Sequence, residues 1–122
     1  MTEVIVPGKE GIYERKGILY VIGPKYIAKV AKAIASESRT MLLHYLSKEP
    51  KSLEELSKLL KQSKANVSNH IRRLEALDLV AATYSPATRG VKKSMELKVK
   101  AIVFVLTPEA LAELGLAQEA TA

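Results

Sequence analysis

The feature that most constrains this chain is a pair of helix patterns separated by only two residues. Ser52 and Glu55 form a capping box, which marks the start of the first helix. Ser63 caps the second helix, directly after the short turn at 61–62. Leucines follow the first cap at helical spacing. The segment therefore predicts two consecutive helices joined by a tight turn, with the second helix spanning 63–78.

The second of these helices has one apolar side and one polar, basic side. On a helical wheel, Ile71 and Leu74 fall within about 40° of Val67, which defines the buried side. The opposite side carries Ala65, Asn69, Arg72 and Arg73, with Asn66 and Ser68 on the flanks. No acidic residue precedes Glu75 on this helix. The pattern predicts an exposed face that is small, polar and positively charged.

Two more helices are expected before this pair, and a β segment before them. Residues 24–35 place apolar side chains at helical spacing, with Pro24 in the first turn. Ser36 is the expected N-cap of a helix that ends near Lys48. In the β segment, two short strands are expected to flank a turn at 14–17. The alternative is a single strand after a loose tail.

After the helix pair, the periodicity changes from helical to alternating, which is typical of strands. Residues 80–85 and 95–100 are expected to be strands, with a loop at 86–90 between them. The second strand is expected to continue into the apolar run 102–106. Thr107 is then the expected cap of a short last helix.

This order of elements predicts an α+β protein with three parts. Residues 1–23 form an N-terminal β segment, and residues 107–122 form a C-terminal helix and tail. Residues 24–106 have the order of a winged helix-turn-helix, which is mainly α with a β-hairpin wing. A chain of 122 residues suits one compact domain and leaves little room for a second.

The charge balance indicates a polyanionic partner. The chain has 19 Lys and Arg against 13 Asp and Glu, a formal net charge of +6. Asn and Arg can pair with base edges, and Ser and Lys near a helix N-terminus suit phosphates. A basic wing over 85–100 can contact the DNA backbone or the minor groove. The expected DNA-binding residues are Ser63, Lys64, Ala65, Asn66, Ser68, Asn69, Arg72, Arg73, Arg89, Lys92 and Lys93.

The stretch 35–106 resembles the winged-helix transcriptional regulators of the ArsR-like class, particularly their short archaeal members. The resemblance lies in Ala-Ser-Glu-Ser-Arg at 35–39, Leu-Glu-Glu-Leu at 53–56 and the whole second helix from Ser63 to Leu74. Leu-Asp-Leu-Val follows at 77–80, where the family usually has Gly-Leu-Val or Gly-Ile-Val. The resemblance implies a regulator that places helix 63–78 in the major groove of double-stranded DNA.

The sequence offers no candidate residues for catalysis or for metal sensing. There is no Cys, and the two histidines are His44, expected to be partly buried, and His70, expected to be structural. Paired carboxylates, a Gly-rich phosphate loop and a nucleophile–base pattern are also absent. Metal-sensing members of the class carry Cys pairs or His/Asp clusters, from which this chain departs. We therefore expect no enzymatic activity, no cofactor and no metal effector.

The sequence also shows none of the features of secreted or membrane proteins. Charged residues interrupt positions 1–20, so no signal peptide is expected there. The apolar run 101–106 is too short to span a bilayer. We expect a cytoplasmic protein associated with the nucleoid, with no membrane partner.

A homodimer is expected because DNA palindromes usually mirror a two-fold axis in the protein, and one such domain contacts little DNA surface. The first and last helices, with the apolar run beside them, form the expected interface. Its residues are Ile27, Val30, Ile34, Phe104, Leu111 and Leu114.

Three other functions stay open at this point. The chain could be an abundant, weakly specific chromatin protein. A winged helix used for protein–protein contact is disfavoured, because such an interface would expose large apolar residues. RNA binding is disfavoured because no aromatic platform for stacking bases is visible.

Overall fold

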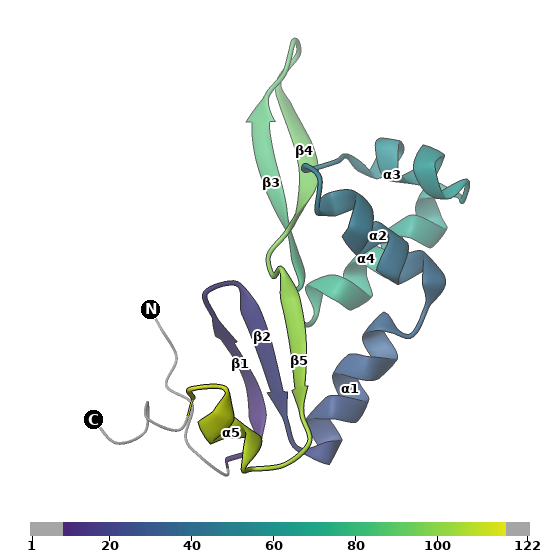
Figure 1. The fold of residues 1–122 in the computed structure, drawn as a ribbon. Helices are drawn as coiled ribbons and strands as arrows, with labels where there is room; N and C mark the ends of the chain where they lie inside the picture. Colours follow the sequence, from purple (N-terminus) through teal and green to yellow (C-terminus); the bar gives the residue numbers. More distant parts are fainter. Residues whose placement is uncertain (1–8, 117–122) are drawn as a thin grey trace. The chain divides into compact units, whose positions relative to one another are not determined.

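The computed structural model describes residues 9–116, which belong to two compact units. The central unit is Lys32–Lys98, and the terminal unit combines the residues up to Ala31 with those from Val99 onward. The elements in chain order are β1 (Gly11–Arg15), β2 (Ile18–Ile22), α1 (Pro24–Ile34), α2 (Glu37–Leu46), α3 (Leu53–Leu60), α4 (Lys64–Glu75), β3 (Val80–Pro86), β4 (Val91–Leu97), β5 (Ala101–Val105) and α5 (Ala110–Glu113) (Figure 1). The tail expected at 118–122 lies outside the described residues.

The three helices of the central unit begin at the predicted caps. The Ser36 hydroxyl accepts a hydrogen bond from the backbone N–H of Arg39, and the Ser63 hydroxyl accepts one from Asn66. Ser52 and Glu55 form both hydrogen bonds of the capping box. Each cap satisfies backbone donors that the helix itself leaves without partners. The predicted starts of α2, α3 and α4 are therefore confirmed.

The tight turn between α3 and α4 is held by local and long-range hydrogen bonds. Lys61 ends α3 in the left-handed conformation, with a φ of 56°. The Ser57 hydroxyl donates to the backbone carbonyl of Gln62, and the Gln62 side chain donates to Ser38 Oγ at 2.7 Å. Because Ser38 lies on α2, the turn is anchored to the neighbouring helix.

Strands β3 and β4 form the predicted antiparallel hairpin, which we call the wing. Its register runs from Val80 opposite Leu97 to Pro86 opposite Val91. At its base, Lys51 from the α2–α3 connection exchanges two backbone hydrogen bonds with Met95 of β4, at 2.8 and 3.0 Å. This bridge fixes the base of the wing to the residues that precede α3.

The terminal unit contains a three-stranded sheet of order β1-β2-β5. Strands β1 and β2 pair antiparallel around Lys16 and Gly17, whose φ angles of 53° and 81° are those of a tight hairpin turn. The predicted pair of N-terminal strands is confirmed, and the single-strand alternative is wrong. Strand β5 pairs with β2 in parallel, from Ala101 opposite Ile18. The N-terminal β segment therefore provides the sheet that β5 joins.

Two of the expected elements differ from the structure near the C-terminus. The single strand expected through 95–106 is wrong, because β4 pairs with β3 in one sheet and β5 with β2 in another. The backbone N–H of Lys98 donates to Leu79, whereas that of Lys100 donates to Gly17. The predicted Thr107 cap is also wrong: α5 is a single turn whose N-cap, Glu109, makes no side-chain hydrogen bond.

Helix α4 ends at Glu75, three residues before the predicted end. The chain then turns through Asp78, which has a φ of 55°, and the backbone N–H of Leu79 donates to Leu74. For a residue that has a Cβ atom, the left-handed conformation has a cost in free energy, and glycine avoids this cost. The Asp at this position stands where the resembled family usually has Gly, and it keeps the glycine-type turn.

This turn gives a prediction about stability. We expect Asp78→Gly to exceed Asp78→Ala in free energy of unfolding by about 1 kcal/mol, because only alanine retains the penalty for a positive φ. Urea unfolding of the two variants measures the difference. Equal stabilities, or a more stable alanine variant, would contradict the left-handed assignment.

Candidate nucleic-acid interface

Helix α4 turns its apolar side into the core of the central unit and leaves its polar side exposed. Val67 and Leu74 are fully buried, and Ile71 is 7% exposed. The helix packs against α2, α3 and β3. The predicted residues Lys64, Ala65, Asn66, Asn69, Arg72 and Arg73 are all exposed, and Ser68 is half-buried. The predicted division of the helix into two faces is therefore confirmed.

The N-terminus of α4 has the chemistry of an anion site. Its first turn contains no acidic residue, and Lys64 is exposed there. The Ser63 oxygen accepts the Asn66 N–H at 3.1 Å, which leaves the hydroxyl proton free to be donated. The partial positive charge of the helix end adds to the charge of Lys64.

A groove of about 550 Å³ lies between α4, the start of α3 and the wing. Lys64, Ser68 and Arg72 line it from α4, and Lys92 and Lys93 line it from β4. These five residues come from two separate segments of the sequence, and all of them were predicted to contact DNA. Leu53, Ile71 and Met95 are apolar residues of the lining, and Glu54 and Glu75 are its acidic ones. Four cationic side chains against two acidic ones make the groove suitable for a polyanion.

The other predicted contact residues do not line this groove. Asn66, Asn69 and Arg73 lie on the exposed side of α4, where they face solvent. Arg89 lies in the loop at the tip of the wing, next to Gly90 with a φ of 73°. The structure thus divides the predicted residues into a groove set, a helix-face set and a wing tip.

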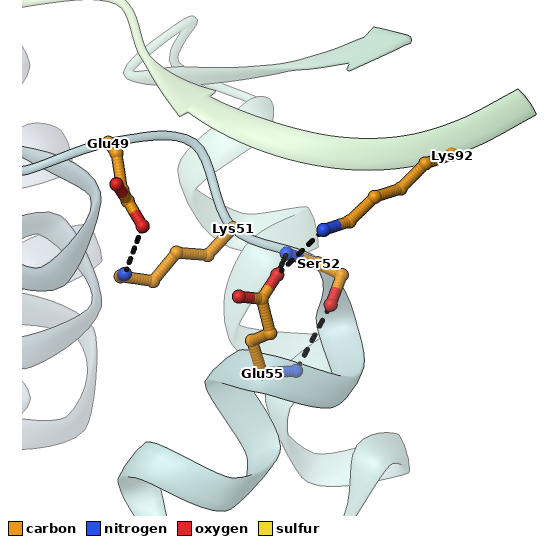
Figure 2. Close-up of polar contacts among 5 residues, drawn as sticks. All are labelled: Glu49, Lys51, Ser52, Glu55 and Lys92. Atoms are coloured by element: carbon orange, nitrogen blue, oxygen red, sulfur yellow. Dashed lines mark hydrogen bonds and ion pairs between the residues drawn. The ribbon is translucent and has the colours of Figure 1, made fainter. Parts of the chain in front are cut away.

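Glu55 is a residue of this region whose second role the sequence analysis missed. One carboxylate oxygen, Oε1, accepts the backbone N–H of Ser52 at 2.9 Å and lies 3.3 Å from Lys92 Nζ (Figure 2). The backbone hydrogen bond from Ser52, the Ser52 side chain and Lys92 hold the pKa of Glu55 below its usual value. The capping box was visible in the sequence, but no local pattern connects Glu55 with the wing.

On its side toward α2, His70 of α4 forms a part-buried polar contact with Arg39. The Arg39 side chain is buried and donates to the backbone carbonyls of Lys32 and Ala33. Its Nη1 lies 3.1 Å from His70 Nδ1. Because arginine only donates, Nδ1 must accept, which requires a neutral imidazole. Burial, and then the charges of Arg39 and Arg73, lower the pKa of His70.

The two histidines therefore differ. The contact with Arg39 agrees with the structural role predicted for His70. His44 was predicted to be partly buried, and this is wrong, because it is exposed on α2. Among residues 9–116, no group of three or more His, Asp or Glu side chains could hold a metal ion. Within the same residues, no helix has the length and apolar character needed to cross a membrane.

The residues predicted to form a dimer interface fall into two groups. Val30 and Leu111 are buried within the protomer itself, so they have no surface left for a partner, and their assignment to the interface is wrong. Ile27, Ile34 and Phe104 are half-buried, and Leu114 is 43% exposed. Leu106, which the prediction omitted, is 80% exposed.

An apolar hollow of about 350 Å³ lies beside Leu106 in the terminal unit. It is lined by Gly23, Pro24, Ile27, Ala28, Val105 and Leu106. Together with the exposed side chain of Leu106, this lining leaves an apolar patch on the surface of the terminal unit.

Comparison with known proteins identifies relatives of this chain. Residues 34–82 match a helix-turn-helix domain family. An uncharacterized HTH-type transcriptional regulator of Methanocaldococcus jannaschii is 31% identical over 88 residues, which make up 72% of this chain and 90% of that protein.

Solved structures share the fold. Reduced HlyU from Vibrio cholerae aligns with a TM-score of 0.50 at 26% identity, over 71% of this chain and 81% of that one. The reduced transcriptional regulator YodB from B. subtilis gives a TM-score of 0.54 at 19% identity, over 80% and 88%. A homodimeric winged helix-turn-helix DNA-binding domain from Mycobacterium bovis, a possible ArsR-family regulator, gives 0.51 at 22%, over 75% and 74%. The predicted winged-helix fold is therefore confirmed.

The contact between Arg39 and His70 predicts how stability depends on pH. His70 has a lowered pKa in the folded protein, so the unfolded chain binds the proton more readily. The stabilisation is complete above the ordinary histidine pKa of 6.5 and is lost as the pH falls through the lower folded value. His70→Asn keeps an acceptor but cannot titrate, so its free energy of unfolding should lack this loss.

Urea unfolding at several pH values between about 7.5 and 5 measures the effect. The stability difference between the wild type and His70→Asn should shrink in acid. His44→Asn is the control and should keep the wild-type profile, because His44 is exposed. Parallel pH profiles for the wild type and His70→Asn would contradict the proposed titration.

Proposed function

This chain belongs to the helix-turn-helix-type transcriptional regulators, and on that premise we propose that it binds double-stranded DNA as a sequence-preferring homodimer. Helix 63–78 would lie in the major groove, and the wing over 85–100 would contact the backbone or the minor groove. The observation that carries this proposal is the cationic groove between α4 and the wing, beside the exposed polar face of the helix.

The exposed face of α4 supports direct reading of bases. Asn69 and Arg72 are exposed and lie three positions apart on one face of the helix. Asn pairs with adenine and Arg with guanine through two hydrogen bonds each. Ala65 is small and exposed near the start of the helix, so the helix end can approach the floor of the DNA groove.

The residues around this face support contacts with phosphates. Ser63, Lys64 and Ser68 lie at or near the N-terminus of α4, where the helix dipole also attracts anions. Lys92 and Lys93 extend the positive charge onto the wing, and Arg89 extends it to the tip. Such contacts set affinity and register but carry no sequence information.

The terminal unit supports a homodimer. Ile27 and Leu106 line the apolar hollow, and Leu106 is largely exposed in the protomer. A second copy of the chain would bury this surface, and each Å² of apolar area removed from water contributes about 25 cal/mol. We propose that the interface uses Ile27, Ile34, Phe104, Leu106 and Leu114.

The proposal also covers what the protein does not need. A regulator that reads DNA requires no catalytic residues, cofactor or metal effector, and the sequence contains no Cys for a thiolate site. The formal net charge of +6 favours association with the nucleoid. Genome-wide footprinting tests the proposal: a set of discrete sites supports a regulator, whereas continuous coverage would identify a weakly specific chromatin protein.

The two sets of DNA contacts predict different mutant behaviour. Arg72→Ala should cost about 1–3 kcal/mol on the best site and relax its sequence preference. Lys93→Ala should weaken binding to all sequences alike and reduce the slope of log affinity against log salt by about one. Binding titrations on specific and random duplexes separate the two. Equal losses on both duplexes for Arg72→Ala would remove the reading role of α4.

The dimer interface gives a further prediction. Replacing Leu106 and Leu114 together with Asp should produce monomers and weaken DNA binding, because charged side chains would take the place of apolar ones in the proposed interface. Both leucines are exposed in the protomer, so the replacements should leave the core intact. Sedimentation velocity at micromolar concentration measures the assembly. Leu59→Asp is the control, since Leu59 is a similarly exposed leucine, 42%, on α3. A wild-type monomer at about 100 μM would overturn the dimer.

A further inference from the structure

The wing carries a lysine that already has an anionic partner in the free protein. Lys92 Nζ lies 3.3 Å from Glu55 Oε1, and the side chains are 51% and 44% exposed. Neighbouring acidic residues behave differently: Glu54 faces Lys58 on its own helix at 3.7 Å. The Glu55–Lys92 pair instead joins α3 to the wing (Figure 2), and of the two residues Lys92 lines the groove.

Of the two partners in this pair, Glu55 is the fixed one. Its carboxylate accepts the backbone N–H of Ser52 at 2.9 Å, and its own backbone N–H donates to the Ser52 hydroxyl at 3.1 Å. Lys92 has a flexible side chain, but its strand is held close to α3 by the backbone bridge between Lys51 and Met95. The carboxylate therefore occupies a set position within reach of the lysine.

We infer that Glu55 competes with DNA phosphate for Lys92 and thereby limits the affinity of the wing for DNA. This inference rests on the proposed function, because it assumes that DNA phosphates enter the groove. To form a full contact with a phosphate, the Lys92 ammonium group must break its ion pair with Glu55 or divide its interaction between the two anions. The carboxylate then stays behind, held by its helix cap, close to the phosphate charge.

Two measurable consequences follow from this competition. Half-exposed ion pairs are weak, so releasing Lys92 should tighten binding only about two- to fivefold. The dependence on salt should also change. In the wild type, Lys92 exchanges the Glu55 carboxylate for a phosphate, so its contact adds little to the net release of counterions. In a variant without this carboxylate, the contact of Lys92 with a phosphate releases counterions from the DNA without that exchange. The slope of log affinity against log salt should therefore become steeper by up to about one.

The variant Glu55→Gln tests the inference without removing the helix cap, because Gln also serves at this position of a capping box. We expect Glu55→Gln to bind a random-sequence duplex about two- to fivefold more tightly than the wild type at about 50 mM salt. The gain should shrink as salt increases. Thermal unfolding checks that the variant folds like the wild type.

Matched controls separate the ion pair from a general effect of charge. Glu49→Gln removes the same charge from another ion pair, in which Glu49 Oε1 lies 3.3 Å from Lys51 Nζ, and Glu49 does not line the groove. Its gain should be smaller and independent of Lys92. Glu55→Gln should give no gain when combined with Lys92→Met, and should keep its gain when combined with Lys93→Met. A gain that persists with Lys92→Met, or that equals the gain of Glu49→Gln, would overturn the inference.

The remaining outcomes separate this inference from the proposed function. If the wild type binds the duplex, and Glu55→Gln binds it equally tightly or more weakly, then the inferred competition is wrong and the DNA-binding proposal stands. If the wild type binds no duplex, the proposed function itself fails. An NMR titration of the free protein examines the pair directly: Lys92→Met should raise the pKa of the Glu55 carboxyl group, and an unchanged pKa would show that the pair does not form.

Discussion

The burial of Val67, Ile71 and Leu74 determines which side of α4 faces solvent, and the proposed interface with DNA depends on that orientation. Each residue along a helix rotates the side-chain direction by about 100°, so a shift of one position would turn either Asn69 or Arg72 toward the core, depending on its direction. Large-to-small substitutions at such buried positions generally cost about 2–5 kcal/mol. The apolar core therefore stabilises the fold and also fixes the orientation of the polar face of α4.

The same few polar residues build the fold and equip the groove. Ser63 caps α4 and lies where a phosphate would approach the helix end. Glu55 caps α3 and neutralises a lysine of the wing. Ser52 and Lys64, at the starts of α3 and α4, both line the groove, so groups at these helix ends lie within reach of a polyanion. In the proposed competition with phosphate, the same carboxylate caps the helix and opposes binding.

A part-buried polar contact also supports α4. Arg39 joins the carbonyls of Lys32 and Ala33 to His70 of α4. A buried guanidinium is stable only when its donors have partners, so this contact restricts how α2 and α4 can be arranged. The position of the exposed face therefore depends on a polar interaction as well as on apolar packing.

The sequence by itself determined the helices of the central unit, their starts and the two faces of α4. Ser36, Ser52 and Ser63 act on donors three residues away, and the apolar period needs only neighbouring turns, so this information is local. It also predicted a hairpin after α4 and the cationic residues of the groove, although the second strand begins at Val91 and not at the predicted residue 95. The end of α4 was less well determined, because Asp78 takes a conformation that sequence patterns associate with glycine.

Only the tertiary structure decided which distant segments meet. The apolar run 101–105 reads like a continuation of β4, yet it leaves the wing because β2 offers it a parallel partner. Val30 and Leu111 have the periodicity of interface residues, but packing buries them within the protomer. The approach of Lys92 to Glu55 likewise arises from the bridge at Met95 and not from any pattern along the chain. Strand partners, burial and ion pairs between elements depend on contacts that form only when the whole chain folds.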